Sequence, residues 1–346
     1  MNYRSISRFF MGTLAGALSA GAVATQWQAL PETAPSPADN PTTSAKVELG
    51  KMLYFDPRFS ATGTVSCDSC HNVMEGGDDH RSTSMGVHGK IGGRNAPTVY
   101  NAAFHSAQFW DGRAASLEEQ AKGPVVNPVE MGMENLDSAV DRLRAIPGYQ
   151  EHFAQAFGGE NPITADNAAK AVAAYERTLI TPNSPYDRYV KGEKAVLSEQ
   201  QVRGMETFDQ LGCTSCHAGA NFDGPSLPPG QPVLMKFPTF PDNNPYVAEY
   251  HLLDDKGRAV ETGKTEDEHL WRVPTLRNLG YTAPYFHNGS VKDLGEAVRV
   301  MAKSQLNKEL SDAQVADVAA FLGALDGTFP VQTMPRLPAT PGDLLP

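Results

Sequence analysis

The chain has 346 residues, which is enough for about two domains of ordinary size. Its composition, 40% hydrophobic and 20% charged, excludes both an intrinsically disordered chain and a membrane-embedded helix bundle. The net charge of −11 argues against nucleic acid or an anionic membrane surface as the main partner, and the 31 glycines and 26 prolines predict many loops.

The first 24 residues have the pattern of a secretory signal peptide. Arg4 and Arg8 precede the uncharged residues 9–24, which end in small side chains. This run is shorter than the roughly 20 residues that span a bilayer, so cleavage is favoured over a retained membrane anchor. Residues 25–44 are rich in proline and are predicted to be a disordered leader. We therefore expect export, most simply to a bacterial periplasm.

All four cysteines fall in two Cys-X-X-Cys-His motifs. Thiols at this spacing can form thioethers with the two vinyl groups of a haem, and the adjacent histidine can then bind the iron. A zinc site would need both motifs to converge on one ion, and a redox Cys-X-X-Cys has no need of the histidine. The sequence thus predicts two covalently attached haem c groups. They are held by Cys67, Cys70 and His71, and by Cys213, Cys216 and His217.

Each motif follows a segment with helical apolar periodicity, at residues 49–56 and 204–208, as at the start of a cytochrome c domain. Capping-box patterns begin predicted helices at Ser198 and at Ser311. We therefore predict a mainly α, loop-rich fold with two cytochrome c-like haem domains. The predicted limits are 45–190 for the N-terminal domain, 191–330 for the C-terminal domain and 331–346 for a Pro-rich tail that wraps over the surface.

The sixth ligand of each iron decides whether that haem reacts with small molecules or only transfers electrons. His88 lies in a glycine-flanked loop that could reach the first iron and also leave it, although nearby His80 competes for this role. Met301 lies late enough in the second domain to cross to the far face of its haem, where a thioether would raise the reduction potential. His287 is a further candidate for a place near the second haem edge.

Three other side chains stand out between the motifs: Trp110, Gln120 and Glu130. Taken alone, Trp110 is an ordinary core aromatic and Glu130 an ordinary helix-cap or surface charge. Their surroundings make the sequence resemble the bacterial di-haem cytochrome c peroxidases over residues 45–330. The stretches that carry the resemblance are 95–98, 109–113, 119–120, 127–133, 272–278 and 282–289.

The resemblance implies different roles for the two haems. The first is the low-potential, peroxide-reducing haem, with His71 as proximal and His88 as displaceable distal ligand. The second is the high-potential, electron-accepting haem, bound by His217 and Met301. Trp110 matches the family's aromatic residue between the haems.

The resemblance also implies a peroxide pocket and a calcium site. Gln120 and Glu130 match the pocket positions, and one carboxylate such as Glu130 can both take a proton from peroxide and return it. Asn95 and the backbone carbonyls of Thr282 and Pro284 match oxygen ligands of a structural calcium ion. The expected reaction is reduction of hydrogen peroxide to water with electrons from a small exported cytochrome c or cupredoxin, and a homodimer is possible.

Two other functions are compatible with two haems in one chain. A related di-haem enzyme oxidises tryptophans of a partner protein to a quinone cofactor, but it has a tyrosine in place of Met301. A non-catalytic electron carrier would need neither Glu130 nor Gln120 nor a mobile His88 loop. Consumption of peroxide by the reduced protein separates these alternatives.

Overall fold

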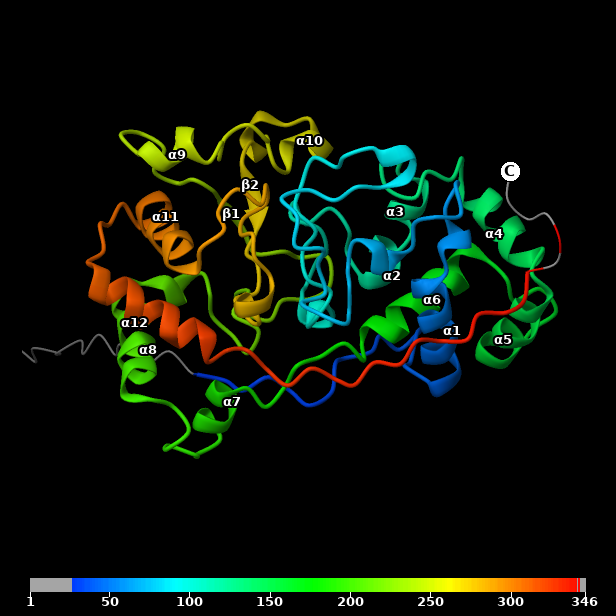
Figure 1. Cartoon of the computed structure of the whole chain (residues 1–346), viewed down its shortest axis with the longest axis horizontal. Coiled ribbons are helices and arrows are strands. Elements are labelled where there is room, and N and C mark those ends of the chain that lie inside the picture. Colours follow the sequence, from blue (N-terminus) through cyan, green and yellow to red (C-terminus); the bar gives the residue numbers. More distant parts are fainter. Residues whose placement is uncertain (1–26, 341, 343–346) are drawn as a thin grey trace, which may run out of the picture.

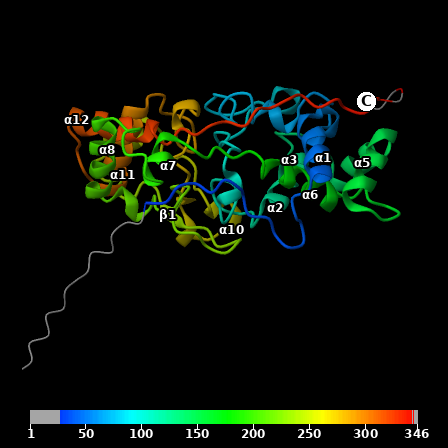
Figure 2. The same ribbon diagram turned by 90° about the horizontal axis from the view of Figure 1, so that it is seen from below.

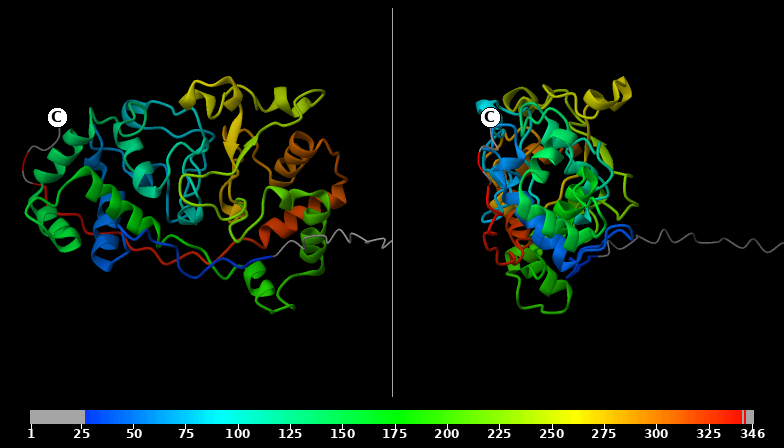
Figure 3. Two further views of the ribbon diagram at one scale, coloured as in Figure 1. Left: turned by 180° about the vertical axis from the view of Figure 1, so that it is seen from behind. Right: turned by 90° about the vertical axis from the view of Figure 1, so that its right-hand side faces the viewer.

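Two pairs of crossed helices organise the molecule, and each pair forms the centre of one lobe (Figure 1). In the computed structural model, which describes residues 27–340 and 342, α1 (Ser44–Phe55) packs on α6 (Ala165–Glu176) in the N-terminal lobe. In the C-terminal lobe, α8 (Glu199–Leu211) packs on α12 (Asp312–Gly323) in the same way. Figure 3 shows the two lobes side by side from behind.

A glycine at each crossing lets the helices approach closely. A Cβ added to Gly50 would lie 1.8 Å from the carbonyl oxygen of Ala171, and one added to Gly204 would lie 1.8 Å from that of Asp317. Each haem motif follows the glycine-bearing helix, at Cys67 and Cys213. The two lobes therefore share one local design, as the sequence predicts, and the mainly helical, loop-rich class is confirmed.

Predicted helix starts are confirmed in the second lobe. Ser198 and Ser311 are the N-caps of α8 and α12, and each forms the full capping box, with Gln201 and Gln314. The other helices are α2 (Leu117–Gln120), α3 (Gly123–Val126), α4 (Leu136–Arg144), α5 (Pro147–Phe157), α7 (Pro185–Val190), α9 (Pro245–Glu249), α10 (Ala259–Thr262) and α11 (Leu294–Leu306). Two short antiparallel strands, β1 (Leu234–Lys236) and β2 (Leu270–Arg272), pair with Met235 opposite Trp271.

Helix α7, which the sequence assigned to the end of the N-terminal domain, packs on the second lobe. Tyr186 of α7 is fully buried in the second core, with its ring 5.1 Å from that of Phe222 between centroids. Asp187 of the same helix forms a fully buried ion pair with Arg277. Helix α7 thus belongs to the C-terminal lobe, because its aromatic and charged side chains find their partners there.

The leader, predicted to be disordered, is ordered from Trp27 onward. Its peptide N–H at Leu30 donates to Asp187 in the second lobe, and Nδ2 of Asn40 donates to Glu118 in the first, at 2.9 and 2.7 Å. Leu30 and Asn40 are buried, so these contacts order a segment that has no regular secondary structure. Its composition alone does not reveal them. Figure 2 shows this segment, in blue, passing from one lobe to the other.

The Pro-rich tail returns from the second lobe over the surface of the first, as expected (Figure 1). Phe329 packs edge-on against Tyr100, and Arg58 donates to the carbonyl oxygen of Pro338 at 2.9 Å. The predicted signal peptide, residues 1–24, lies outside the described residues. Within residues 27–340 and 342, no helix has the length and apolar character needed to cross a bilayer.

Candidate haem sites and the cavity between the lobes

Each Cys-X-X-Cys-His motif borders its own cavity. The first cavity, of about 1040 Å³, is lined by Cys67, Cys70 and His71. The second is a mostly apolar slot lined by Cys213 and His217, and Met301 of α11 also borders it. The thiols, histidines and slot that a covalently bound haem needs are therefore present twice.

Both motif histidines are held in the orientation that an iron ligand requires. Nδ1 of His71 lies 3.0 Å from the carbonyl oxygen of Pro97, and Nδ1 of His217 lies 2.9 Å from that of Phe222. A backbone carbonyl can only accept, so Nδ1 carries the hydrogen and Nε2 remains available for a metal. Burial lowers the pKa of both rings, which favours the neutral form that binds iron.

A shared zinc ion does not fit this arrangement, because the two motifs lie in separate cavities. Moreover, within residues 27–340 and 342 no group of three or more histidine, cysteine, aspartate or glutamate side chains is placed to hold a metal ion. The residues thus fit haem and not a zinc site.

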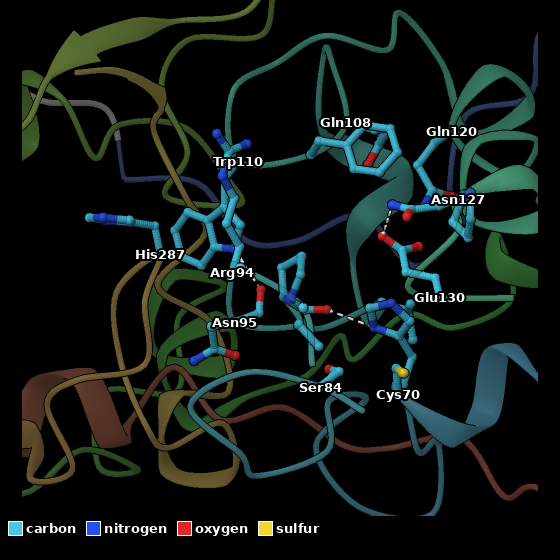
Figure 4. Close-up of a pocket in the computed structure, with 18 of the residues that line it drawn as sticks. Cys70, Ser84, Arg94, Asn95, Gln108, Trp110, Gln120, Asn127, Glu130 and His287 are labelled. Carbon is cyan, nitrogen blue, oxygen red and sulfur yellow. Dashed lines mark hydrogen bonds between the residues drawn. The ribbon is translucent and has the colours of Figure 1, made fainter. Parts of the chain in front are cut away.

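Glu130 and Gln120 line the first cavity, together with Asn127 (Figure 4). Nδ2 of Asn127 donates to Oε1 of Glu130 at 2.6 Å. Burial raises the pKa of Glu130, whereas the positive charge of Arg113 and the hydrogen bond from Asn127 act in the opposite direction. The cavity therefore contains a carboxylate whose affinity for a proton is adjusted by its neighbours. Asn127 belongs to a stretch that carries the family resemblance, but no sequence pattern indicates this contact.

Trp110 lines both cavities and so lies between the two motifs. Its Nε1–H donates to the carbonyl oxygen of Asn95 at 2.9 Å, as Figure 4 shows. Its own carbonyl accepts a 2.8 Å hydrogen bond from the peptide N–H of Arg272 in β2. The indole is thereby held from the first lobe and the backbone of Trp110 from the second.

The residues expected to bind calcium also meet where the lobes join. Asn95 is buried, and its Nδ2 lies 2.6 Å from the carbonyl oxygen of Pro284. Asn95, Thr282 and Pro284 all border the second cavity.

Neither of the two loop histidines lines the first cavity. His88 is exposed in a tight turn with a φ of 56° and borders a separate shallow hollow with Asp68 and Asp79. Nε2 of His80 lies 3.0 Å from Oε2 of Glu75, and its Nδ1 lies 3.3 Å from the carbonyl oxygen of Ala283. His88 and His71 therefore border different cavities.

His287 lies elsewhere than expected. It borders the first cavity and not the second, and its ring stacks on Trp271 with 4.2 Å between centroids. Its Nε2 is buried without a hydrogen-bond partner among the described residues, and burial lowers its pKa to about 4. The peptide N–H of Asn95 donates to its carbonyl oxygen, which holds it in the lobe interface.

The comparisons with known proteins agree with this geometry. Residues 44–195 match the family model described as di-haem cytochrome c peroxidase. The chain is 43% identical to cytochrome c551 peroxidase of Pseudomonas aeruginosa over 90% of this chain and 87% of that protein. It is 34% identical to the methylamine utilization protein MauG of Methylorubrum extorquens, over 89% and 86% of the two chains. Among solved structures, a MauG-like protein associated with microbial copper homeostasis superimposes with a TM-score of 0.74 and 28% identity, covering 86% of this chain and 95% of that one.

Proposed function

Because the chain belongs to the di-haem cytochrome c peroxidase family, we propose that peroxide is reduced in the cavity of Glu130 and that electrons enter at the second motif. The predicted family and activity are confirmed: the chain is a cytochrome c peroxidase that reduces hydrogen peroxide. It carries two haem c groups, attached at Cys67 and Cys70 and at Cys213 and Cys216. When bound, each haem supplies an iron that holds and releases one electron, and the first iron supplies a position where peroxide can be reduced.

Glu130 is the proposed proton-transfer residue of the reaction. Breaking the O–O bond requires one oxygen of peroxide to lose its proton and the other to gain one, and a single carboxylate can carry out both transfers. Glu130 borders the cavity beside Gln120, and its pKa is raised by burial. The Gln120 side chain has both an amide donor and an amide acceptor with which to orient peroxide. This shared position in one cavity is the observation that carries the proposal.

We assign the distal and axial ligands from the same geometry. Met301 borders the second slot together with His217, so a thioether ligand there fits a high-potential haem that takes electrons from a cytochrome. His88 is the proposed displaceable ligand of the first iron. Its exposed position in a turn between Gly86 and Gly89 supports a ligand that can leave the iron.

Calcium is the proposed ion at the lobe interface. Rotating the Asn95 side-chain amide by half a turn would place its oxygen beside the Pro284 carbonyl, and oxygen ligands suit a hard cation. The chain is further proposed to act in the periplasm after cleavage of residues 1–24, to accept electrons from a small cytochrome c or cupredoxin and to work as a homodimer.

Exchange of Glu130 for glutamine tests the proposal. We expect Glu130→Gln to lower peroxide turnover by a factor on the order of a hundred or more, with a reduced small cytochrome c as donor and an unchanged haem spectrum. Turnover close to that of the unaltered protein would remove Glu130 from the proton-transfer role.

A further inference from the structure

A buried charged cluster lies between the two haem cavities. It joins His105 of the first lobe to Asp223 and Arg272 of the second, with Nδ1 of His105 2.5 Å from Oδ2 of Asp223 and 3.1 Å from Nη1 of Arg272. The His105 side chain is only 4% exposed and that of Asp223 13%. His105 and Arg272 border both cavities. A titratable ring is therefore located where electrons pass between the haems.

Hydrogen bonds from both lobes hold the cluster. Nδ2 of Asn221 donates to the same Asp223 oxygen at 3.0 Å, and the hydroxyl of Thr275 donates to Oδ1 of Asn221, also at 3.0 Å. Nε of Arg272 donates to the carbonyl oxygen of Phe109, the residue before Trp110, at 3.2 Å. The His105 ring is thus held by polar neighbours from both lobes, and like Trp110 it borders both cavities.

These neighbours determine which ring nitrogen can take up a proton. The pKa of Asp223 is lowered by its bonds to His105 and Asn221 and by Arg272, so Asp223 is an ionised acceptor. Two donors, Nη1 of Arg272 and Nδ2 of Asn221, also lie 3.1 and 3.4 Å from Nδ1 of His105, but the 2.5 Å contact with the Asp223 carboxylate is the shortest. We therefore assign the hydrogen to Nδ1, which leaves Nε2 as the position that takes up a proton. Asp223 and Arg272 are the charged groups that face the ring, and Asp111 also acts on Arg272.

The surroundings of His105 favour the neutral form of its ring while the second haem is oxidised. Burial lowers the pKa of His105, Arg272 lowers it further, and Asp223 opposes both effects. An electron that arrives nearby adds a negative charge in a medium of low dielectric constant, which raises the affinity of the ring for a proton. Asp223 follows Phe222, whose carbonyl accepts a hydrogen bond from His217, and the charge of Asp223 acts on the His217 ring, so the cluster is linked to the second motif.

We propose that His105 takes up one proton when the second haem gains one electron and releases it when the electron leaves. The iron is reduced from the ferric to the ferrous state by the donor's electron, a proton comes from water, and an N–H bond forms at Nε2. This inference rests on the proposed role of the second haem as the electron-accepting one. It makes His105 the residue that compensates charge during electron transfer.

Potentiometric titration of the holoprotein tests this inference without peroxide. The midpoint potential of the second haem is followed by its visible spectrum from about pH 5 to about 8. It should fall with rising pH, with a slope that corresponds to at most one proton taken up per electron. In His105→Gln this dependence should be absent in the same range. His152→Gln, in α5 of the first lobe, is the matched control and should keep the dependence of the unaltered protein.

A second variant settles the case in which His105→Gln fails to bind haem. Asp223→Asn keeps the ring but removes the charge that favours its protonation, so the pH range of the dependence should move to lower pH. A flat titration of the unaltered protein, or an unchanged range in these two variants, overturns the inference. Failure of the proposed function would give a different result. Glu130→Gln would keep full peroxide turnover, and the pH dependence of the haem potential would be unaffected.

Discussion

Asn127 donates a 2.6 Å hydrogen bond from Nδ2 to Oε1 of Glu130, three residues further along the same loop. The bond stabilises the carboxylate and therefore lowers the pKa of Glu130 against the effect of burial. Together with burial and the charge of Arg113, this bond determines the pH at which Glu130 can accept a proton.

Replacing Asn127 should shift the pH dependence of the reaction. In Asn127→Ala the pKa of Glu130 rises, because a hydrogen bond to a charged group contributes about 1.5–3 kcal/mol. The acidic limb of the kcat/KM profile should move up by about one pH unit or more, since one unit corresponds to about 1.4 kcal/mol. Steady-state assays with peroxide at several pH values measure this shift. Asn161→Ala, at an exposed position, is the control, and identical profiles for both variants would contradict the prediction.

Removing His88 tests the displaceable ligand. We expect His88→Gly to reduce peroxide without prior reduction of the second haem, because nothing then has to leave the first iron. Stopped-flow absorbance of the fully oxidised protein mixed with peroxide would reveal this. If the variant still requires reduction first, or is inactive with full haem content, His88 does not have the proposed role.

Calcium removal should act through Asn95. Treatment with a calcium chelator should lower turnover of the unaltered protein several-fold, and added Ca²⁺ should restore it, because a cation held by both lobes fixes their interface. Asn95→Leu should show low turnover that responds to neither treatment. Equal responses of the two proteins would place the ion elsewhere.

The helix crossing in the second lobe predicts opposite effects for two glycines. Gly204→Ala places a methyl group 1.8 Å from the carbonyl oxygen of Asp317, so α8 and α12 must separate, at a cost of about 1–3 kcal/mol or more. Gly323→Ala, near the end of α12, meets no atom within 4 Å and should be neutral or stabilise the fold by up to about 1 kcal/mol. Denaturant unfolding of both holoproteins compares them, and similar midpoints would show that the crossing can adapt.

The buried ion pair of α7 should matter far more than an exposed one nearby. Asp187→Asn leaves the Arg277 guanidinium buried without its anion, which costs about 3–5 kcal/mol of the free energy of unfolding. Glu193→Gln removes the exposed partner of Arg188 and should leave the unfolding midpoint unchanged. A small effect for Asp187→Asn would mean that water reaches Arg277.

The parts of the molecule that the sequence predicted depend on neighbours in the chain. The haem motifs and the capping boxes at Ser198 and Ser311 each lie within five residues, so local chemistry is enough to identify them. The family resemblance then suggested Glu130 and Trp110, which the structure places in the first cavity and between the two cavities.

The parts that the sequence did not predict depend on distant pairs. His105 and Asp223 are 118 residues apart, and neither shows a pattern that marks the other. The leader was expected to be disordered because its composition is polar, yet Leu30 and Asn40 are buried against residues more than 70 positions away. Helix α7 was assigned to the first domain because the partners of Tyr186, which lie later in the chain, leave no local pattern.

The first and last parts of the described chain each pack on the lobe that the other part of the sequence forms. Trp27, at the start, packs on Phe321 in the core of the second lobe, while Phe329, near the end, packs on Tyr100 in the first. A proteolytic cut in the connection at residues 182–184 would therefore leave two fragments that each contribute an aromatic anchor to the other. The distance between the two redox centres is thus maintained by packing contacts that each fragment makes with the other lobe, and it does not depend on the connecting peptide alone.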